Sequence, residues 1–217
     1  MGYITHGIPR DIVKQIVNET KISNFVETGT YLGNTCLWAA TYFENIFTIE
    51  IDPEISKNAS NRLETIKNIE FLIGDSSKIL PDLLKKISGP TLFWLDGHYS
   101  GPNTGGVGFE CPIMHEIEAI SVLDKPIIFI DDARLFMGPL PEPHKSDQWP
   151  RIDEIFHSLW INFPNHSTTI HDDVIICVPK EIQKIIDLDW KNKFNHRYST
   201  NDPSFTGKIK DKISSFF

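Results

Sequence analysis

Apolar and polar residues follow one another along the chain in blocks that predict strands and helices in turn. Short apolar runs with the length of buried strands lie at 24–27, 46–51, 69–73, 91–95 and 127–130. The segments between them carry apolar residues at helical spacing, as does the segment that begins near Pro9. Strands that alternate with helices are typical of βαβ units, so the pattern predicts a parallel sheet with helices on both faces.

The end of this pattern is different. Two further predicted strands, 167–171 and 174–178, are separated only by Asp172 and Asp173. Because so short a connection joins only antiparallel strands, these two segments should form a hairpin. We therefore predict an α/β fold with a Rossmann-like, seven-stranded sheet that is mostly parallel and ends in an antiparallel hairpin. Residues 1–180 should form this domain, and the polar segment 181–217, with its weak helical pattern, should extend it.

The charge balance points away from nucleic acid as a partner. The 217 residues include 21 Lys and Arg against 29 Asp and Glu, a net charge of -8, and no basic cluster stands out. Binding to a nucleic-acid backbone depends on basic groups that displace counterions, so we expect no nucleic-acid partner. The three Cys include no CxxC pair, which argues against a zinc site or a disulfide framework. The sequence leaves a homo-oligomer open.

The hydrophobic runs are too short for a membrane span. None reaches the roughly 18 consecutive apolar residues that a spanning helix needs. The first residues are charged where a secretory signal would carry an apolar block. We therefore expect a cytoplasmic protein.

A glycine-containing turn joins the first predicted strand to the next helix, with the sequence Glu27-Thr28-Gly29-Thr30-Tyr31-Leu32-Gly33. Glycine lets the backbone turn sharply and approach a ligand closely. The spacing is E-x-G-x-x-x-G, which differs from the G-x-G-x-x-G of dinucleotide enzymes. An acid at this strand end would repel a pyrophosphate but suits a cationic ligand.

Two further strands end in polar residues. Glu50 closes the second strand, where an acid can accept hydrogen bonds from ribose hydroxyls. Gly74, Asp75 and Ser76 follow the third strand. Since ligands of open α/β sheets bind at the carboxyl ends of the strands, these residues should converge on one edge of the sheet.

The segments VETGTYLGNT, TIEIDPE, IGDSS, LFWLDGHYSG and IFIDDAR, in this order and spacing, resemble class I S-adenosylmethionine-dependent methyltransferases. The resemblance covers roughly residues 22 to 180 and includes the terminal hairpin of that family. It implies that Glu50 holds the ribose hydroxyls of S-adenosylmethionine and that Asp75 and Ser76 lie near its adenine. The remaining cofactor-binding residues that it implies are Glu27, Thr28, Gly29, Tyr31, Gly33 and Asp96.

Three aspartates follow the fourth and fifth strands. Asp96 comes after one, and Asp131 and Asp132 come after its expected neighbour. Three carboxylates at close range would repel one another, and a divalent cation would remove the conflict. Oxygen ligands suit Mg²⁺. The sequence therefore predicts a metal site at Asp96, Asp131 and Asp132, although acids after strands also cap loops in many α/β proteins.

This arrangement is similar to the catechol and macrocin-type O-methyltransferases, which implies Mg²⁺-assisted methylation of a hydroxyl group. The catechol enzymes carry a lysine base three positions past the first Asp, where this chain has Tyr99. We therefore assign His98 as the candidate base, alongside Asp96 as a catalytic residue. A histidine in such a loop can also be only hydrogen-bonded. Two long loops follow the fourth and fifth strands, and the first, 97–110, contains five glycines and is predicted to act as a lid.

The sequence as a whole predicts an S-adenosylmethionine-dependent methyltransferase that methylates a small hydroxylated acceptor such as a sugar or glycan precursor. An NAD-dependent oxidoreductase, a non-catalytic cofactor-binding relative and a carboxylate-metal hydrolase are alternatives. Tyr99, Phe136 and Trp149 are candidates either for the core or for stacking on the acceptor.

Overall fold

The computed structural model describes residues 7–99, 101 and 108–198, with the backbone alone for 196–198. Half of the predicted lid, at residue 100 and at 102–107, and the end of the predicted extension, 199–217, lie outside the described residues. Among the described residues, no helix is both long and apolar enough to cross a membrane.

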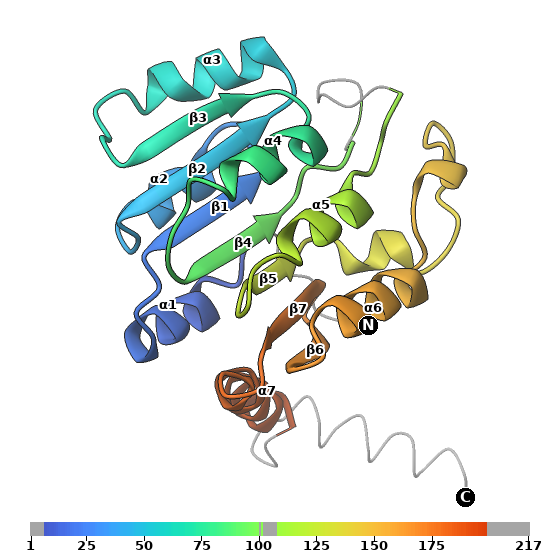
Figure 1. Cartoon of the computed structure of the whole chain (residues 1–217). Coiled ribbons are helices and arrows are strands. Elements are labelled where there is room, and N and C mark those ends of the chain that lie inside the picture. Colours follow the sequence, from blue (N-terminus) through green and yellow to red (C-terminus); the bar gives the residue numbers. More distant parts are fainter. Residues whose placement is uncertain (1–6, 100, 102–107, 199–217) are drawn as a thin grey trace, which may run out of the picture.

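Seven strands form one sheet in the order β3-β2-β1-β4-β5-β7-β6 (Figure 1). The first five are parallel to one another, whereas β7 runs antiparallel to both β5 and β6. The predicted mixed sheet with a terminal hairpin is therefore confirmed. The strands are β1 (Asn24–Thr28), β2 (Asn45–Glu50), β3 (Ile69–Ile73), β4 (Thr91–Leu95), β5 (Ile127–Ile130), β6 (His166–His171) and β7 (Val174–Pro179).

Helices cover both faces of the sheet and bury a separate apolar cluster on each face. Helices α4 (Ser76–Leu83), α5 (Ile113–Ile120) and α6 (Ile152–Asn162) pack on the face toward the viewer in Figure 1. The other face is covered by α1 (Arg10–Glu19), α2 (Asn34–Ala39), α3 (Pro53–Arg62) and α7 (Gln183–Tyr198). Two short 3₁₀ helices, Ala133–Phe136 and Ser146–Gln148, lie in the loop between β5 and α6.

The strand order places a switch point between β1 and β4. From β1 the chain moves to β2 and β3 on one side, and later returns through β4 to β5 on the other side. Connections from neighbouring strands leave in opposite directions at such a point, which opens a crevice at the carboxyl ends of the strands. The loops after β1, β2, β4 and β5 all lie at this edge because these strands are parallel.

Local sequence explains why the helix after β2 begins where it does. Asp52 is the N-cap of α3, and its Oδ1 accepts hydrogen bonds from the N–H groups of Glu54 and Ile55 at 2.8 and 3.0 Å. Pro53 occupies the first helical position, where its lack of an N–H costs nothing. This cap fixes the path of the chain directly after Glu50, at the edge of the sheet where the predicted ligand residues lie.

Helix α7 docks on the sheet through the two buried residues Ile185 and Ile186. Its Lys193 pairs with Asp172 of the β6–β7 turn, at 2.8 Å. The first part of the predicted extension is therefore an ordered helix that contacts the hairpin.

Candidate active site

The loop after β1 has the backbone shape that its glycines predict. Gly29 and Gly33 have φ angles of 85° and 70°, in the left-handed region that favours glycine. A Cβ on Gly29 would collide with the carbonyl oxygen of Asp96, and one on Gly33 would lie 2.8 Å from Leu63 Cδ1. The two glycines therefore allow the loop to pass close to the chain after β4 and to α3.

Glu27 lies beneath this loop. Its carboxylate is buried, and Oε2 accepts hydrogen bonds from Cys36 Sγ at 2.7 Å and Thr48 Oγ1 at 2.8 Å. Burial raises the pKa of Glu27 to about 7, and the hydrogen bonds from Cys36 and Thr48 offset that rise only in part. Glu27 thus ties β1 to β2 and to α2 under the candidate ligand site.

Glu50 connects the loops after β1 and β2. Its Oε2 accepts a hydrogen bond from the Tyr31 N–H at 3.0 Å, and its Oε1 accepts one from the Asp52 N–H at 3.1 Å. Each carboxylate oxygen has a second acceptor site. The side chain is therefore held at the sheet edge in a fixed orientation, with acceptor capacity remaining for two hydroxyl groups.

Asp75 and Ser76 lie after β3, where each has a partner within the protein. Asp75 is the N-cap of α4; it accepts hydrogen bonds from the Ser77 N–H and hydroxyl at 3.0 and 2.6 Å and pairs with Lys78 at 3.1 Å. Burial acts to raise the pKa of Asp75, but these partners lower it below its usual value. Ser76 donates to the buried carboxylate of Glu116 at 2.5 Å.

Glu116 is a buried acid on α5 that the sequence did not indicate as part of the site. Its Oε1 lies 3.5 Å from where a Cβ of Gly97 would be, directly below the chain after β4. Burial raises the pKa of Glu116 to about 7, opposed in part by hydrogen bonds from Ser76 and Thr28. The sequence could have indicated Glu116, because it is a polar residue in the first turn of an otherwise apolar helix face.

Large apolar side chains are exposed at the same edge of the sheet. Tyr31 and Leu32 in the loop after β1 are 55% and 52% exposed, and Ile73 at the end of β3 is 56% exposed. Ile51, directly after Glu50, is 40% exposed. Apolar groups that gather at the ends of three neighbouring strands can form a platform for a flat apolar ligand.

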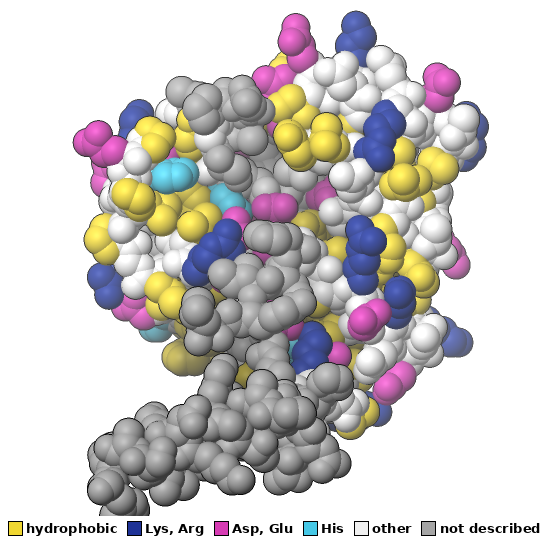
Figure 2. All heavy atoms as spheres, turned by 180° about the vertical axis from the view of Figure 1, so that it is seen from behind, with side chains coloured by type: hydrophobic (Ala, Val, Ile, Leu, Met, Phe, Trp, Pro, Cys, Tyr) yellow, Lys and Arg dark blue, Asp and Glu magenta, His cyan; other side chains and the backbone are white. Residues whose placement is uncertain are grey.

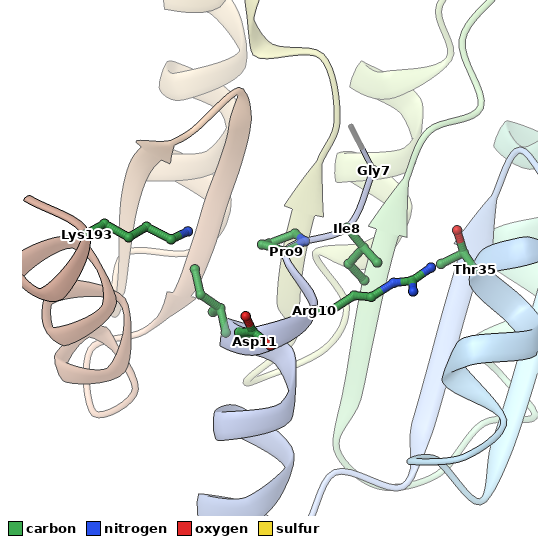
Figure 3. A pocket seen from close by; sticks show the side chains of 8 residues that line it. Gly7, Ile8, Pro9, Arg10, Asp11, Thr35 and Lys193 are labelled. Atoms are coloured by element: carbon green, nitrogen blue, oxygen red, sulfur yellow. The ribbon is translucent and has the colours of Figure 1, made fainter. Parts of the chain in front are cut away.

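A cavity of about 290 Å³ lies between the start of α1, the start of α2 and α7 (Figure 3). Arg10 extends toward Thr35 at the start of α2, and Lys193 approaches from α7 on the opposite side. The Arg10 guanidinium lies 5.5 Å from the centre of the Trp38 ring, and no carboxylate of the described residues forms an ion pair with it. The cavity is also lined by Gly7, Ile8, Pro9, Asp11 and Ile12.

A second group of polar side chains lies at the ends of β4 and β5. One potential ligand atom from each of Asp96, His98 and Asp132 lies within 4.8 Å of the others. His98 Nε2 is 3.1 Å from Asp132 Oδ2, and His98 Nδ1 is 4.0 Å from Asp96 Oδ1. The structure therefore brings together two of the three aspartates predicted as metal ligands and adds His98, the candidate base.

Asp131 and Arg134 surround this group without belonging to it. Asp131 Oδ1 accepts a hydrogen bond from the Asp132 N–H at 2.8 Å. Arg134 pairs with Asp132 Oδ1 at 2.7 Å and also with Asp173 at the start of β7. Asp132 has a φ of 55°, so the backbone turns in the left-handed region at this point and directs its side chain toward His98.

The close spacing of these groups changes their acidity. Burial, together with Asp131 and Asp132, raises the pKa of Asp96, and burial raises the pKa of Asp131 to about 6. Burial acts to lower the pKa of His98, but the hydrogen bond to Asp132 and the charge of Asp96 raise it above its usual value. Burial acts to raise the pKa of Asp132, and His98 and Arg134 lower it.

Tyr99, Phe136 and Trp149 are all buried, and so belong to the packed interior around this group. Trp149 contacts His98 with ring centres 5.3 Å apart, and contacts Phe136 at 5.8 Å. Its indole Nε1 donates to Glu110 at 2.8 Å. Glu110 is a second buried acid that sequence reasoning did not single out, because its partners lie some 40 positions further along the chain.

Comparisons with known proteins give a structural likeness only. No protein-family model matches the chain, and no curated protein matches its sequence. A protein from Staphylococcus aureus, assigned as a candidate caffeoyl-CoA O-methyltransferase, is similar with a TM-score of 0.57 at 14% identity, over 82% of this chain and 86% of that one. Cofactor-bound Rv0187 from MTB gives a TM-score of 0.52 at 14% identity, over 82% and 84%.

The 23S rRNA methyltransferase ErmE is also similar, with a TM-score of 0.50 at 11% identity over 80% of this chain and 69% of that one. Likeness at such low identity concerns the arrangement of helices and strands rather than the substrate. Together with the strand order and the terminal hairpin, it shows that the chain has the Rossmann-like fold of class I S-adenosylmethionine-dependent methyltransferases.

Proposed function

We propose that this protein is an S-adenosylmethionine-dependent methyltransferase. The observation that carries the proposal is the position of Glu50, which the N–H groups of Tyr31 and Asp52 hold at the end of β2, beside the glycine loop. A carboxylate fixed there can accept both ribose hydroxyls of a nucleoside. The acids around the site suit a cationic sulfonium donor better than a pyrophosphate.

The residues of this edge fit the parts of S-adenosylmethionine in turn. Ile51 and Ile73 offer an apolar platform to the adenine, and Glu50 binds the ribose. The cavity beside Thr35 has room for the amino-acid tail, whose carboxylate would meet the Arg10 guanidinium. The cofactor supplies an electrophilic methyl group on its sulfur, and the protein contributes mainly by aligning that methyl with the acceptor oxygen.

We extend the proposal to a divalent cation on the acceptor side. The donor set fits an ion, because two carboxylates and one imidazole offer atoms within 4.8 Å of one another. Asp96, His98 and Asp132 would hold the ion. Asp131 would orient Asp132 by accepting a hydrogen bond from the Asp132 backbone N–H. Such an ion lowers the pKa of a bound hydroxyl group. A carboxylate-rich set accepts Mg²⁺ or Mn²⁺, and the nitrogen ligand favours Mn²⁺ of the two.

The role of His98 as base uses the same side chain. Its ring lies between Asp96 and Asp132, so it is placed either to bind the ion or to receive the acceptor proton. Metal dependence separates the two roles: turnover that persists in a chelator favours the base, and turnover that stops favours the ligand.

We propose a small hydroxylated acceptor such as a sugar. The net charge of -8 opposes a nucleic-acid backbone. On the face shown in Figure 2, the basic side chains are spread out and interspersed with acidic ones rather than gathered into a stripe. Acidic and histidine side chains lie together near the centre of that face.

Calorimetric titration with S-adenosylhomocysteine, compared with NAD⁺, tests the donor. The protein should bind S-adenosylhomocysteine and not NAD⁺. Glu50→Ala should weaken binding about 10- to 100-fold, because it removes charge-assisted hydrogen bonds of about 1.5–3 kcal/mol. Glu70→Ala, which removes an exposed carboxylate from the neighbouring strand β3, is the matched control and should leave affinity unchanged. Binding of NAD⁺ alone would contradict the proposal.

A further inference from the structure

Glu110 is a buried carboxylate at which two loops meet. It is 3% exposed and lies just before α5, at the end of the loop that follows β4. Its Oε2 accepts hydrogen bonds from Trp149 Nε1 at 2.8 Å and from the Lys145 N–H at 3.0 Å, both in the loop before α6. Its backbone takes part as well, since its carbonyl accepts from the Tyr99 N–H at 2.7 Å and its N–H donates to Gln148 Oε1 at 3.0 Å.

These partners satisfy the charge of Glu110. A carboxylate removed from water is costly unless it is hydrogen-bonded. Burial acts to raise the pKa of Glu110, yet the hydrogen bonds from Trp149 and the Lys145 N–H hold it below its usual value. Glu110 is an ionised, buried acid: its carboxylate accepts hydrogen bonds from the loop before α6, and its backbone is bonded within the loop after β4. It therefore connects the two loops rigidly.

The connection continues to the acceptor side of the site through Trp149. Its indole ring is 8% exposed and meets the His98 ring at 63°, with centres 5.3 Å apart. His98 is in turn 3.1 Å from Asp132 and 4.0 Å from Asp96. The orientation of the His98 ring is therefore set from one side by the carboxylates and from the other by an indole that Glu110 fixes.

We infer that Glu110 and Trp149 are positioning residues for His98: the Glu110–Trp149 hydrogen bond joins the two loops and holds the imidazole against Asp96 and Asp132. This inference rests on the acceptor-side part of the proposed function and deepens it. It assigns a role to two residues that are not among those proposed to hold the ion or receive the acceptor proton. The geometry of His98 is testable without cofactor, metal or acceptor, so the inference and the proposed function can fail separately.

The first test observes the His98 ring in the metal-free protein. Long-range ¹⁵N–¹H spectra of the histidine rings are recorded for the wild-type chain and five variants, and His98→Gln assigns the signals. At a pH above its raised pKa, where the ring is neutral, wild-type His98 should show two well-separated ring nitrogens, as expected of a tautomer fixed by a hydrogen bond. Glu110→Ala and Trp149→Leu should bring these two shifts together, toward those of a histidine that exchanges between tautomers.

Two conservative variants separate positioning from general loss of structure. Glu110→Gln keeps an acceptor oxygen and should retain most of the wild-type spectrum, whereas Trp149→Phe keeps a ring beside His98 but loses the N–H that Glu110 accepts and should alter the His98 signals. Asp147→Asn changes an exposed carboxylate in the same loop and is the matched control. Thermal unfolding of each variant confirms that it is folded. Wild-type His98 signals in folded Glu110→Ala or folded Trp149→Leu would overturn the inference. If either variant fails to fold, Trp149→Phe is compared with Asp147→Asn. Altered His98 signals in Trp149→Phe then support the inference, and unaltered signals overturn it.

The second test measures Mn²⁺ affinity by the electron paramagnetic resonance signal of the free ion. Trp149→Leu should weaken Mn²⁺ binding about 10- to 100-fold, as loss of residues that orient a ligand does in metal sites. Affinity for S-adenosylhomocysteine should change less than about twofold. Equal Mn²⁺ binding in the wild type and Trp149→Leu overturns the inference, whereas a wild type that binds no Mn²⁺ but shows the expected spectra removes the metal proposal and leaves the positioning role intact.

Discussion

The donor and acceptor sides of the site are built in different ways. At the ends of β1 and β2, backbone geometry determines the site: Gly29 and Gly33 shape one loop, and Glu50 binds two backbone N–H groups. At the ends of β4 and β5, side chains from distant segments determine it. Substitutions on the donor side should therefore affect the fold and nucleoside binding together, and those on the acceptor side should spare both.

The largest effect should come from Gly29→Ala. The new Cβ would collide with the Asp96 carbonyl in a conformation that already disfavours side chains, which costs about 1–3 kcal/mol before the collision is counted. We expect lower thermal stability and a loss of S-adenosylhomocysteine binding by more than about tenfold, measured by unfolding and calorimetry. Gly138→Ala is the control, because its Cβ would meet no atom within 4 Å. Equal behaviour of the two variants would remove the proposed role of the loop.

Asp132→Ala should affect the acceptor side alone. Asp132 contacts both His98 and Arg134, so its loss should lower Mn²⁺ affinity at least about tenfold and leave S-adenosylhomocysteine affinity unchanged. Asp131→Asn should have a smaller effect on Mn²⁺, because Asp131 lies outside the group of three potential ligands. An effect of Asp131→Asn as large as that of Asp132→Ala would support the ligand set predicted from the sequence, with Asp131 in place of His98.

The pH dependence of stability reports on the buried acids beneath the site. Burial raises the pKa of Glu27 and of Glu116 to about 7 in the folded state. Between their unfolded values near 4.5 and 7, the folded protein binds more protons than the unfolded chain, so stability falls as pH rises through this window. Each group changes the free energy of unfolding by up to about 3 kcal/mol.

Chemical denaturation at pH 5, 6, 7 and 8 measures this trend. Glu27→Gln should make the curve flatter, because the amide resembles the protonated acid and does not titrate. Glu64→Gln, at an exposed carboxylate, should leave the slope as it is. Equal slopes in Glu27→Gln and the wild type would contradict the environment described for Glu27.

The smallest effect should come from the surface ion pair at the start of α4. Lys78 is 82% exposed and pairs with Asp75 at 3.1 Å. Exposed pairs of this kind contribute about 0–1 kcal/mol, so Lys78→Ala should change the free energy of unfolding by less than about 0.5 kcal/mol. Urea denaturation measures it, and a change of several kcal/mol would show that the start of α4 depends on this pair far more than the described contacts indicate.

Sequence patterns predicted the sheet because strand periodicity and turn chemistry are local. The runs at 69–73, 91–95 and 127–130 match the observed strands, and the short connection at Asp172 and Asp173 determined the antiparallel hairpin. Glu27 and Glu50 were recognised by their positions at strand ends for the same reason.

Local sequence patterns did not predict the partners of these residues. The sequence did not indicate that Ser76 would donate to Glu116 or that Glu110 would accept from Trp149. Each contact depends on how helices and loops pack, and residues such as Glu110 look like ordinary surface acids in the sequence. His98 was noticed for its chemistry, but its place between two carboxylates follows only from the pairing of β4 with β5.

A crystal structure of the protein with S-adenosylhomocysteine tests the central claim most directly. We expect ribose hydroxyls on the Glu50 carboxylate and the amino-acid tail in the cavity lined by Arg10 and Thr35. A nucleoside bound elsewhere, or bound at this edge without contact to Glu50, would contradict it.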